Sequence, residues 1–226
     1  MSLRRRDLAA AIFALAVAAL FVRLGVWQLN RLAERKVANA AIQAARALAP
    51  VELPLHRVEP EVLQDRRAQA RGAYDYAHER VWTGRTYDGA PGVALLTPLR
   101  LSDGSAVFVD RGFVPSPDAM HVDEARYREG DSANVTGLAL PAPRDRGDVN
   151  PTTLHDSLPY AVLGIVLLLN DTAAPHPMGL LRWRPPLLDN GYFLTYAIIW
   201  FTFALIAIVG TVIVLWKTAK PSREGV

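Results

Sequence analysis

The sequence predicts a membrane-anchored α+β protein, in which a hairpin of two transmembrane helices flanks a mostly antiparallel β domain. Three observations support this fold class. Residues 193–216 are an uncharged apolar run, residues 8–29 are a second apolar run with a single charge, and short apolar segments separated by turn residues lie between the two. The chain has 226 residues, 51% of them hydrophobic, which fits two membrane spans and one domain in water.

The C-terminal run, residues 193–216, is long enough to cross a bilayer as a helix. A helix rises about 1.5 Å per residue and the hydrocarbon core is about 30 Å thick. Only a helix leaves no backbone group unpaired in a single span. Lys217, Lys220 and Arg223 follow the run at once. Basic flanks are typical of the cytoplasmic side, so residues 217–226 are predicted to be a cytoplasmic tail.

Residues 8–29 predict the other transmembrane helix, preceded by a basic cytoplasmic tail, residues 1–7. Arg23 lies near the far end of this span, where its side chain can snorkel to the surface. The alternative is a cleaved secretory signal, because residues 16–18 (Ala-Val-Ala) resemble a cleavage site. That triplet lies inside the apolar run rather than after it, which favours the helix.

Ala10, Ala14 and Ala18 are four residues apart and give this helix a smooth face. Small residues at that spacing let two membrane helices approach closely, so we expect this face to contact the C-terminal helix. Both tails are then cytoplasmic and the domain between them is extracytoplasmic. Arg31, Arg35 and Lys36 make the opposite end of the first helix basic as well, so this orientation depends mainly on the C-terminal flank.

Residues 30–190 are predicted to form one β-rich domain. The first helix is expected to continue through residue 47, before Pro50 and Pro54. The predicted strands are residues 67–74, 93–101, 106–114, 133–140 and 161–169, with a short helix at 118–129. Asp103-Gly104 between two apolar runs predicts a hairpin, and Pro98 predicts an edge strand or a bulge.

The polar residues contain no convincing catalytic site. No cysteine is present, which excludes disulfides and thiolate metal sites. His121 and Glu124 have the spacing of half a metal site, although a solvated surface pair is more common. Residues 155–157 (His-Asp-Ser) are adjacent in sequence, unlike a hydrolytic triad, and Asp110-Arg111 is best interpreted as structural. The net charge of +3 is dispersed, so no nucleic-acid partner is indicated.

The candidate binding residues lie where the two spans meet the outer surface. Trp27, Gln28 and Arg31 are at that end of the first helix, with Arg35 one turn further, and Tyr196 and Trp200 are at that end of the second. Antiparallel pairing predicts a cationic, aromatic-lined groove for an amphiphilic anionic ligand or a partner helix. The alternative is an ordinary interfacial belt of Trp, Tyr and Arg.

Five segments resemble the SURF1 family, the assembly factors of cytochrome c oxidase. LGVWQLNRLAERK (24–36) resembles the signature of the family's first helix, and RGAYD (71–75) its early strand. GVALLTPL (92–99) and VFVDRGFVP (107–115) are similar to its central block, and LTYAIIWF (194–201) to the start of its second helix. These segments occur in the family's order.

The resemblance implies a non-enzymatic inner-membrane protein that helps haem a enter subunit I of a haem–copper oxidase. Some members are thought to carry haem through a histidine that opens the second helix. Phe193 occupies that position here and cannot ligate iron, whereas Arg31 or Arg23 would suit haem propionates. The alternative is a permanent accessory subunit of a respiratory complex. The first span follows no long presequence, which favours a bacterial inner membrane with a periplasmic domain.

Overall fold

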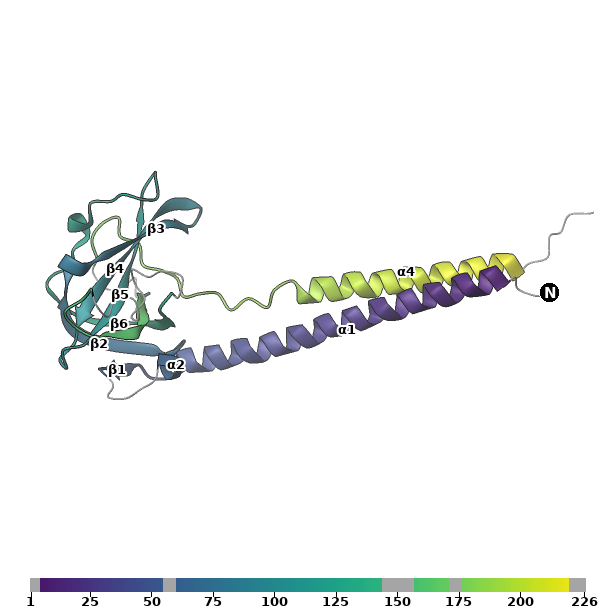
Figure 1. The fold of residues 1–226 in the computed structure, drawn as a ribbon, viewed down its shortest axis with the longest axis horizontal. Helices are drawn as coiled ribbons and strands as arrows, with labels where there is room; N and C mark the ends of the chain where they lie inside the picture. Colours follow the sequence, from purple (N-terminus) through teal and green to yellow (C-terminus); the bar gives the residue numbers. More distant parts are fainter. Residues whose placement is uncertain (1–4, 55–59, 144–156, 171–175, 220–226) are drawn as a thin grey trace, which may run out of the picture. The chain divides into compact units, whose positions relative to one another are not determined.

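The computed structural model describes residues 5–54, 60–143, 157–170 and 176–219 (Figure 1). The outermost residues of the two predicted tails lie outside this part of the chain, as do His155 and Asp156. The chain divides into two units. Met1–Ala41 with Leu188–Val226 is the helical unit, and Ile42–Leu187 is the β unit.

The helical unit contains two long helices, α1 (Arg5–Ala47) and α4 (Phe193–Ala219). These are the two helices expected from the apolar runs, and α1 continues to Ala47 as predicted. The last residues of α1 belong to the β unit. At about 1.5 Å per residue, α1 is about 65 Å long and α4 about 40 Å. Both are long and apolar enough to cross a membrane, and membrane anchoring rests on that length and composition.

The two helices pack antiparallel through small residues (Figure 1). Buried positions recur at every seventh residue, at Ala11, Ala18 and Gly25 in α1 and at Ala197 and Ala204 in α4. This spacing is typical of helices that cross at a small angle. The expected face of Ala10, Ala14 and Ala18 does lie toward α4, since Ala10 and Ala14 line a hollow between the helices opposite Ala207 and Gly210, and it is offset from the most buried positions. Of those three, only Ala18 is buried, Ala14 is half-buried and Ala10 is exposed.

The β unit is a small barrel. Its strands are β1 (Val51–Leu53), β2 (Arg67–Tyr74), β3 (Arg80–Tyr87), β4 (Ala90–Arg100), β5 (Ala106–Pro115), β6 (Ser132–Pro141) and β7 (Val162–Leu169). They are arranged in the order β1-β2-β6-β7-β5-β4-β3. A further antiparallel pairing of Tyr74 with Leu99 joins β2 to β4 and closes the ring. Only β1–β2 and β5–β7 are parallel.

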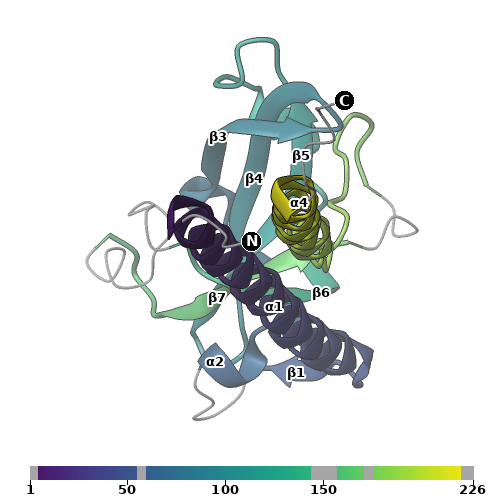
Figure 2. The same ribbon diagram turned by 90° about the vertical axis from the view of Figure 1, so that its right-hand side faces the viewer.

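Two main cores stabilise the β unit. The first takes buried side chains from β2, β4, β5, β6 and β7, so it fills the barrel. The second covers the outer surface of β4, β5 and β7, where Trp183 packs against Phe113. Segment 177–184 crosses this surface, and Leu181 forms a backbone bridge with Phe113. Figure 2 shows the same unit from the side, with β3 at the edge beside β4.

The five predicted strands and the hairpin between β4 and β5 are confirmed. The edge assignment for Pro98 is wrong because β4 is paired on both sides, and the bulge in the β4–β5 ladder lies opposite Leu95 and Leu96, with Arg111 of β5 as the extra residue. Pro98 lies between Leu96, which pairs with β3, and Leu99, which pairs with β2. A ladder N–H is therefore not required at this position.

The predicted helix at 118–129 is also wrong, since it is reduced to the 3-10 turn η2 (Glu124–Tyr127). The Asp118 carboxylate accepts hydrogen bonds from the backbone N–H groups of Met120 and His121. Such side-chain bonds favour a turn over a helix. The remaining short helices are α2 (Pro60–Leu63) and η1 (Tyr76–His78).

Candidate functional site

An aromatic cluster lies between the helices near the start of α4. The Phe21 ring stacks on Trp200 with centroids 5.6 Å apart and contacts Phe203 at 5.7 Å. One turn along, Gly25 faces Phe201 so closely that a Cβ added there would lie 2.7 Å from its ring. Glycine at position 25 therefore sets how closely the helices approach, and it fixes the register of α1 against α4.

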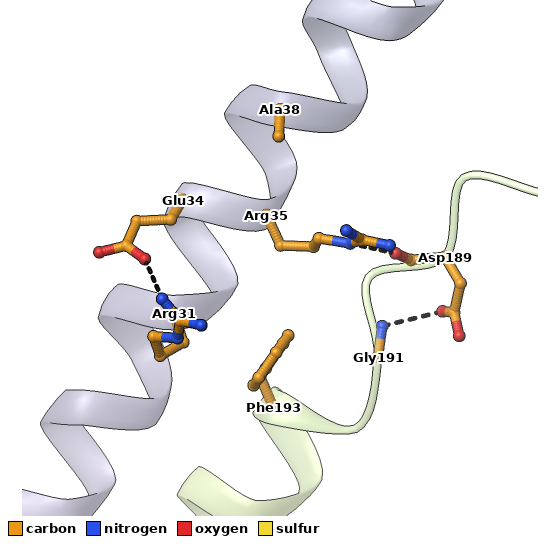
Figure 3. Close-up of a pocket in the computed structure, with 7 residues that line it drawn as sticks. All are labelled: Arg31, Glu34, Arg35, Ala38, Asp189, Gly191 and Phe193. Atoms are coloured by element: carbon orange, nitrogen blue, oxygen red, sulfur yellow. Dashed lines mark hydrogen bonds and ion pairs between the residues drawn. The ribbon is translucent and has the colours of Figure 1, made fainter. Parts of the chain in front are cut away.

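Beyond Gly25 the helical unit opens into a hollow of about 390 Å³, which we call the arginine hollow (Figure 3). Its lining residues come from α1 and from the segment that leads into α4: Arg31, Glu34, Arg35, Ala38, Asp189, Gly191 and Phe193. The Arg35 side chain and the Phe193 ring reach into the space between the two chain segments, whereas Arg31 lies along α1 and points toward Glu34 (Figure 3). The hollow combines two guanidinium groups with one apolar ring.

Hydrogen bonds from α1 hold the segment before α4. The Arg35 Nε donates to the Asp189 carbonyl oxygen at 3.2 Å, and the buried Asn39 donates to the same oxygen at 3.1 Å. The Asp189 carboxylate accepts the Gly191 N–H at 2.9 Å, which closes a local turn. Arg35 thus uses its Nε here, and its terminal nitrogens make no hydrogen bond or ion pair with a described residue.

The Arg31 guanidinium pairs with Glu34 at 2.8 Å, one turn along the same helix. Both side chains are more than half exposed, at 53% and 64%. Exposed pairs of this kind contribute about 0.2–1 kcal/mol and are easily exchanged. An incoming carboxylate or phosphate could therefore displace Glu34 from Arg31 at small cost.

The predicted site residues are not all brought together. Trp27 lies about 200° around α1 from Gly25, so it faces away from α4 and is 53% exposed. Trp200 packs on Phe21 instead, and Tyr196 is 51% exposed. Of the five residues, only Arg31 lines the hollow.

Gln28 lies between the cluster and the hollow. Its Oε1 is buried and has no hydrogen-bond partner among the described residues. Whether Trp27, Gln28, Arg31, Tyr196 and Trp200 form a ligand groove stays a prediction. Arg35, which the sequence places one helical turn beyond Arg31, also lines the hollow. Phe21, Asn39 and Asp189 gave no comparable signal because their roles depend on the partner segment.

The β unit holds a second group of buried charges, around Asp110 and Arg111. The Arg111 guanidinium donates to Glu79 Oε2 at 2.5 Å and to the Thr97 hydroxyl at 2.7 Å. Asp110 accepts the Trp183 indole N–H at 2.7 Å. Both side chains are almost fully buried. These contacts agree with the structural interpretation of this pair.

The donor set of the hollow decides which part of a haem it could receive. Two guanidinium groups suit carboxylates, and the Phe193 ring suits a macrocycle edge. No lining residue supplies an imidazole, thiolate or thioether. His121 pairs with Asp118 at 2.7 Å, and the described residues contain no group of three metal-ligating side chains. The residues therefore fit haem propionates and do not fit axial ligation of the iron.

Comparison with known proteins gives consistent matches. The model of the SURF1 family matches residues 15–205. An uncharacterized SURF1-like protein of Mycobacterium tuberculosis is 29% identical over 214 residues, covering 84% of this chain and 76% of the relative. A SURF1-like protein of Monosiga brevicollis is 29% identical over 107 residues, covering 42% and 41%. Surfeit locus protein 1 of Takifugu rubripes is 27% identical over 119 residues, covering 46% and 50%.

Proposed function

The chain belongs to the SURF1 family, whose members generally assist the assembly of cytochrome oxidase, and we propose from this premise that it assists haem a insertion into subunit I of a haem–copper oxidase. It does so as a binding and scaffolding protein rather than as an enzyme. Its proposed location is a bacterial inner membrane, with both tails cytoplasmic and the β unit periplasmic. The mycobacterial SURF1-like relatives support a bacterial setting.

The observation that carries the haem proposal is the arginine hollow. In the proposed topology it lies just outside the outer limit of the apolar run, where an amphiphilic molecule would place its charged groups. Arg31 and Arg35 would hold haem propionates, and the Phe193 ring would contact the apolar macrocycle. Phe193 offers no ligand to iron, so the chain would hold haem by its edge and release it readily to the oxidase.

The first experiment is deletion of the gene and complementation. We expect deletion to lower haem a content and oxidase activity in membranes. The wild-type chain should restore both, and a chain with Arg31→Gln and Arg35→Gln should restore them only in part. Arg126→Gln is a matched control, because Arg126 is an exposed arginine of the β unit. Normal haem a content after deletion would refute the proposal.

A permanent accessory subunit is the second candidate function, and the lack of an iron ligand at Phe193 favours it. The two candidates differ in stoichiometry. A subunit copurifies with the mature oxidase at a fixed ratio, whereas an assembly factor is found with immature oxidase and is absent from the mature enzyme. Quantitative mass spectrometry of the purified mature oxidase separates them.

A further inference from the structure

Arg23 is a charge in the middle of an apolar surface. It lies within residues 8–29, about 9 Å below the outer limit at Leu29 on the proposed topology. Its side chain is exposed, and it makes no hydrogen bond or ion pair with any residue that the structure describes. The neighbours three and four positions away are Ala19, Leu20, Val26 and Trp27, so α1 itself supplies no anion.

Other arginines of the chain are matched to carboxylates. Arg46 meets Asp65 at 3.1 Å, and Arg182 meets Glu129 at 3.0 Å. Arg184 meets Asp88 at 3.4 Å. Arginines outside the membrane can also rely on water. On the proposed topology, Arg23 has neither bulk water nor a carboxylate partner among the described residues, and a charged side chain at membrane depth normally has a partner or a function.

Snorkelling does not readily bring the Arg23 guanidinium to the nearer headgroups. Side chains on a helix tilt toward its N-terminus, and the N-terminus of α1 is the proposed cytoplasmic end. The favoured direction of the Arg23 side chain is therefore deeper into the bilayer, away from the nearer headgroups. An anion at the same depth would pair with the guanidinium without requiring the side chain to turn back toward the outer headgroups.

The surroundings of Arg23 suit a helix as the carrier of that anion. Ile12, Ala16, Ala19 and Trp27 all lie within about 40° of Arg23 around α1, and all five are exposed. We call these residues the Arg23 face. Arg23 lies about 120–160° around α1 from the buried Gly25, Ala18 and Ala11, and every residue of the face is exposed, so α4 does not cover it. Ala16 and Ala19 would allow close approach of a second backbone.

We propose that the Arg23 face binds one transmembrane helix of the oxidase subunit whose assembly the chain assists, and that a carboxylate in the outer half of that helix pairs with Arg23. This inference rests on the proposed function and names its partner contact. The charge complementarity is specific, because a bidentate guanidinium–carboxylate pair in a dry setting is strong and directional. The inference assigns the arginine hollow to the cofactor and the Arg23 face to the oxidase subunit.

The test uses the full-length chain coexpressed with the oxidase subunits in native membranes. A photo-crosslinking amino acid at Ala19 should capture an oxidase subunit. The same probe at Leu205, which is 60% exposed on α4, should not. Arg23→Leu should lower the Ala19 crosslink by about tenfold or more, and Arg23→Lys, which keeps the charge but loses the bidentate geometry, should lower it less. The amount of each variant in the membrane is measured in parallel.

Two outcomes would overturn the inference. The first is no oxidase subunit in the Ala19 crosslink, and the second is an undiminished crosslink with Arg23→Leu, which would assign Arg23 to lipid headgroups. A charge exchange provides the positive control. Arg23→Glu should lose the crosslink, and an arginine in place of the partner carboxylate should restore it.

These results are separable from the proposed function. If deletion lowers haem a content but Arg23→Leu complements fully, the docking inference fails and the assembly function stands. If deletion leaves haem a content unchanged, the assembly function fails whatever the crosslinks show.

Discussion

Asp110 and Arg111 are neighbours in β5 whose side chains enter opposite sides of the sheet, and Arg111 is the extra residue where the β4–β5 ladder shifts register. Arg111 stacks near Tyr76, with the guanidinium carbon 5.2 Å from the ring, and pairs with Glu79. Asp110 faces Trp183 on the other side. Each buried charge has several polar partners, which is the condition for tolerating it in a core.

Burial raises the pKa of the Asp110 carboxyl to about 7, although the Trp183 and Gly112 hydrogen bonds and the charge of Arg85 oppose this. The unfolded value is about 3.9. Between these values the folded state binds more protons than the unfolded state, so the free energy of unfolding falls as pH rises.

We therefore expect the chain to be more stable at pH 5 than at pH 7, by on the order of 2 kcal/mol from this group. Asp110→Asn keeps an acceptor for Trp183 and should lose this pH dependence. The measurement is chemical unfolding of the detergent-purified chain at both pH values, followed by tryptophan fluorescence. An unchanged pH dependence in the variant would assign the effect to another group.

At the scale of elements, the local sequence pattern predicts that the two helices exist, but it does not predict how they pack. The two apolar runs define their helices without reference to the rest of the chain. The register does not follow, because it depends on which residues of α4 meet Gly25 and Ala18. The same limit explains the site: Arg31 lines the hollow, whereas Trp27, which was predicted to face the groove between the helices, lies on the side of α1 that α4 leaves uncovered.

Strand prediction followed the same rule. Five of the described β strands and the hairpin turn carry local signals and were predicted, whereas β1 and β3 were missed. The ring closure of β2 with β4, the central place of β7 and the covering segment with Trp183 involve residues far apart in sequence. The prediction that Pro98 lies on an edge strand failed for this reason. Two different strands, β3 and β2, pair with the same side of β4, before and after Pro98.

Gly25→Leu tests the helix register. The larger side chain would overlap Phe201, and overpacking of this kind costs about 1–3 kcal/mol. The chain has no cysteine, so cysteines placed at Phe21 and Phe203 would be the only thiols. We expect a short thiol crosslinker to join them, and Gly25→Leu to reduce the yield several-fold.

Gly210→Leu is the matched control, because a Cβ at Gly210 meets nothing within 4 Å. It should leave the crosslinking yield unchanged. Equal yields for the two leucine variants would contradict the role assigned to Gly25.

At the scale of the whole molecule, the main prediction concerns orientation in the membrane. A protease added to spheroplasts should digest the β unit, and the same protease added to inverted vesicles should leave it intact. An epitope at the N-terminus should remain on the mature protein and be accessible only in inverted vesicles. Loss of that epitope would show that residues 8–29 act as a cleaved signal.

The position of β7 constrains how the molecule is made. This strand is the last of the barrel in sequence, yet it is hydrogen-bonded on one side to β5 and on the other to β6. A nascent chain that ends before Leu169 leaves a gap in the wall of the barrel. On the proposed topology, the polypeptide between the two membrane segments would therefore cross the membrane unfolded and complete its barrel on the far side only late in synthesis.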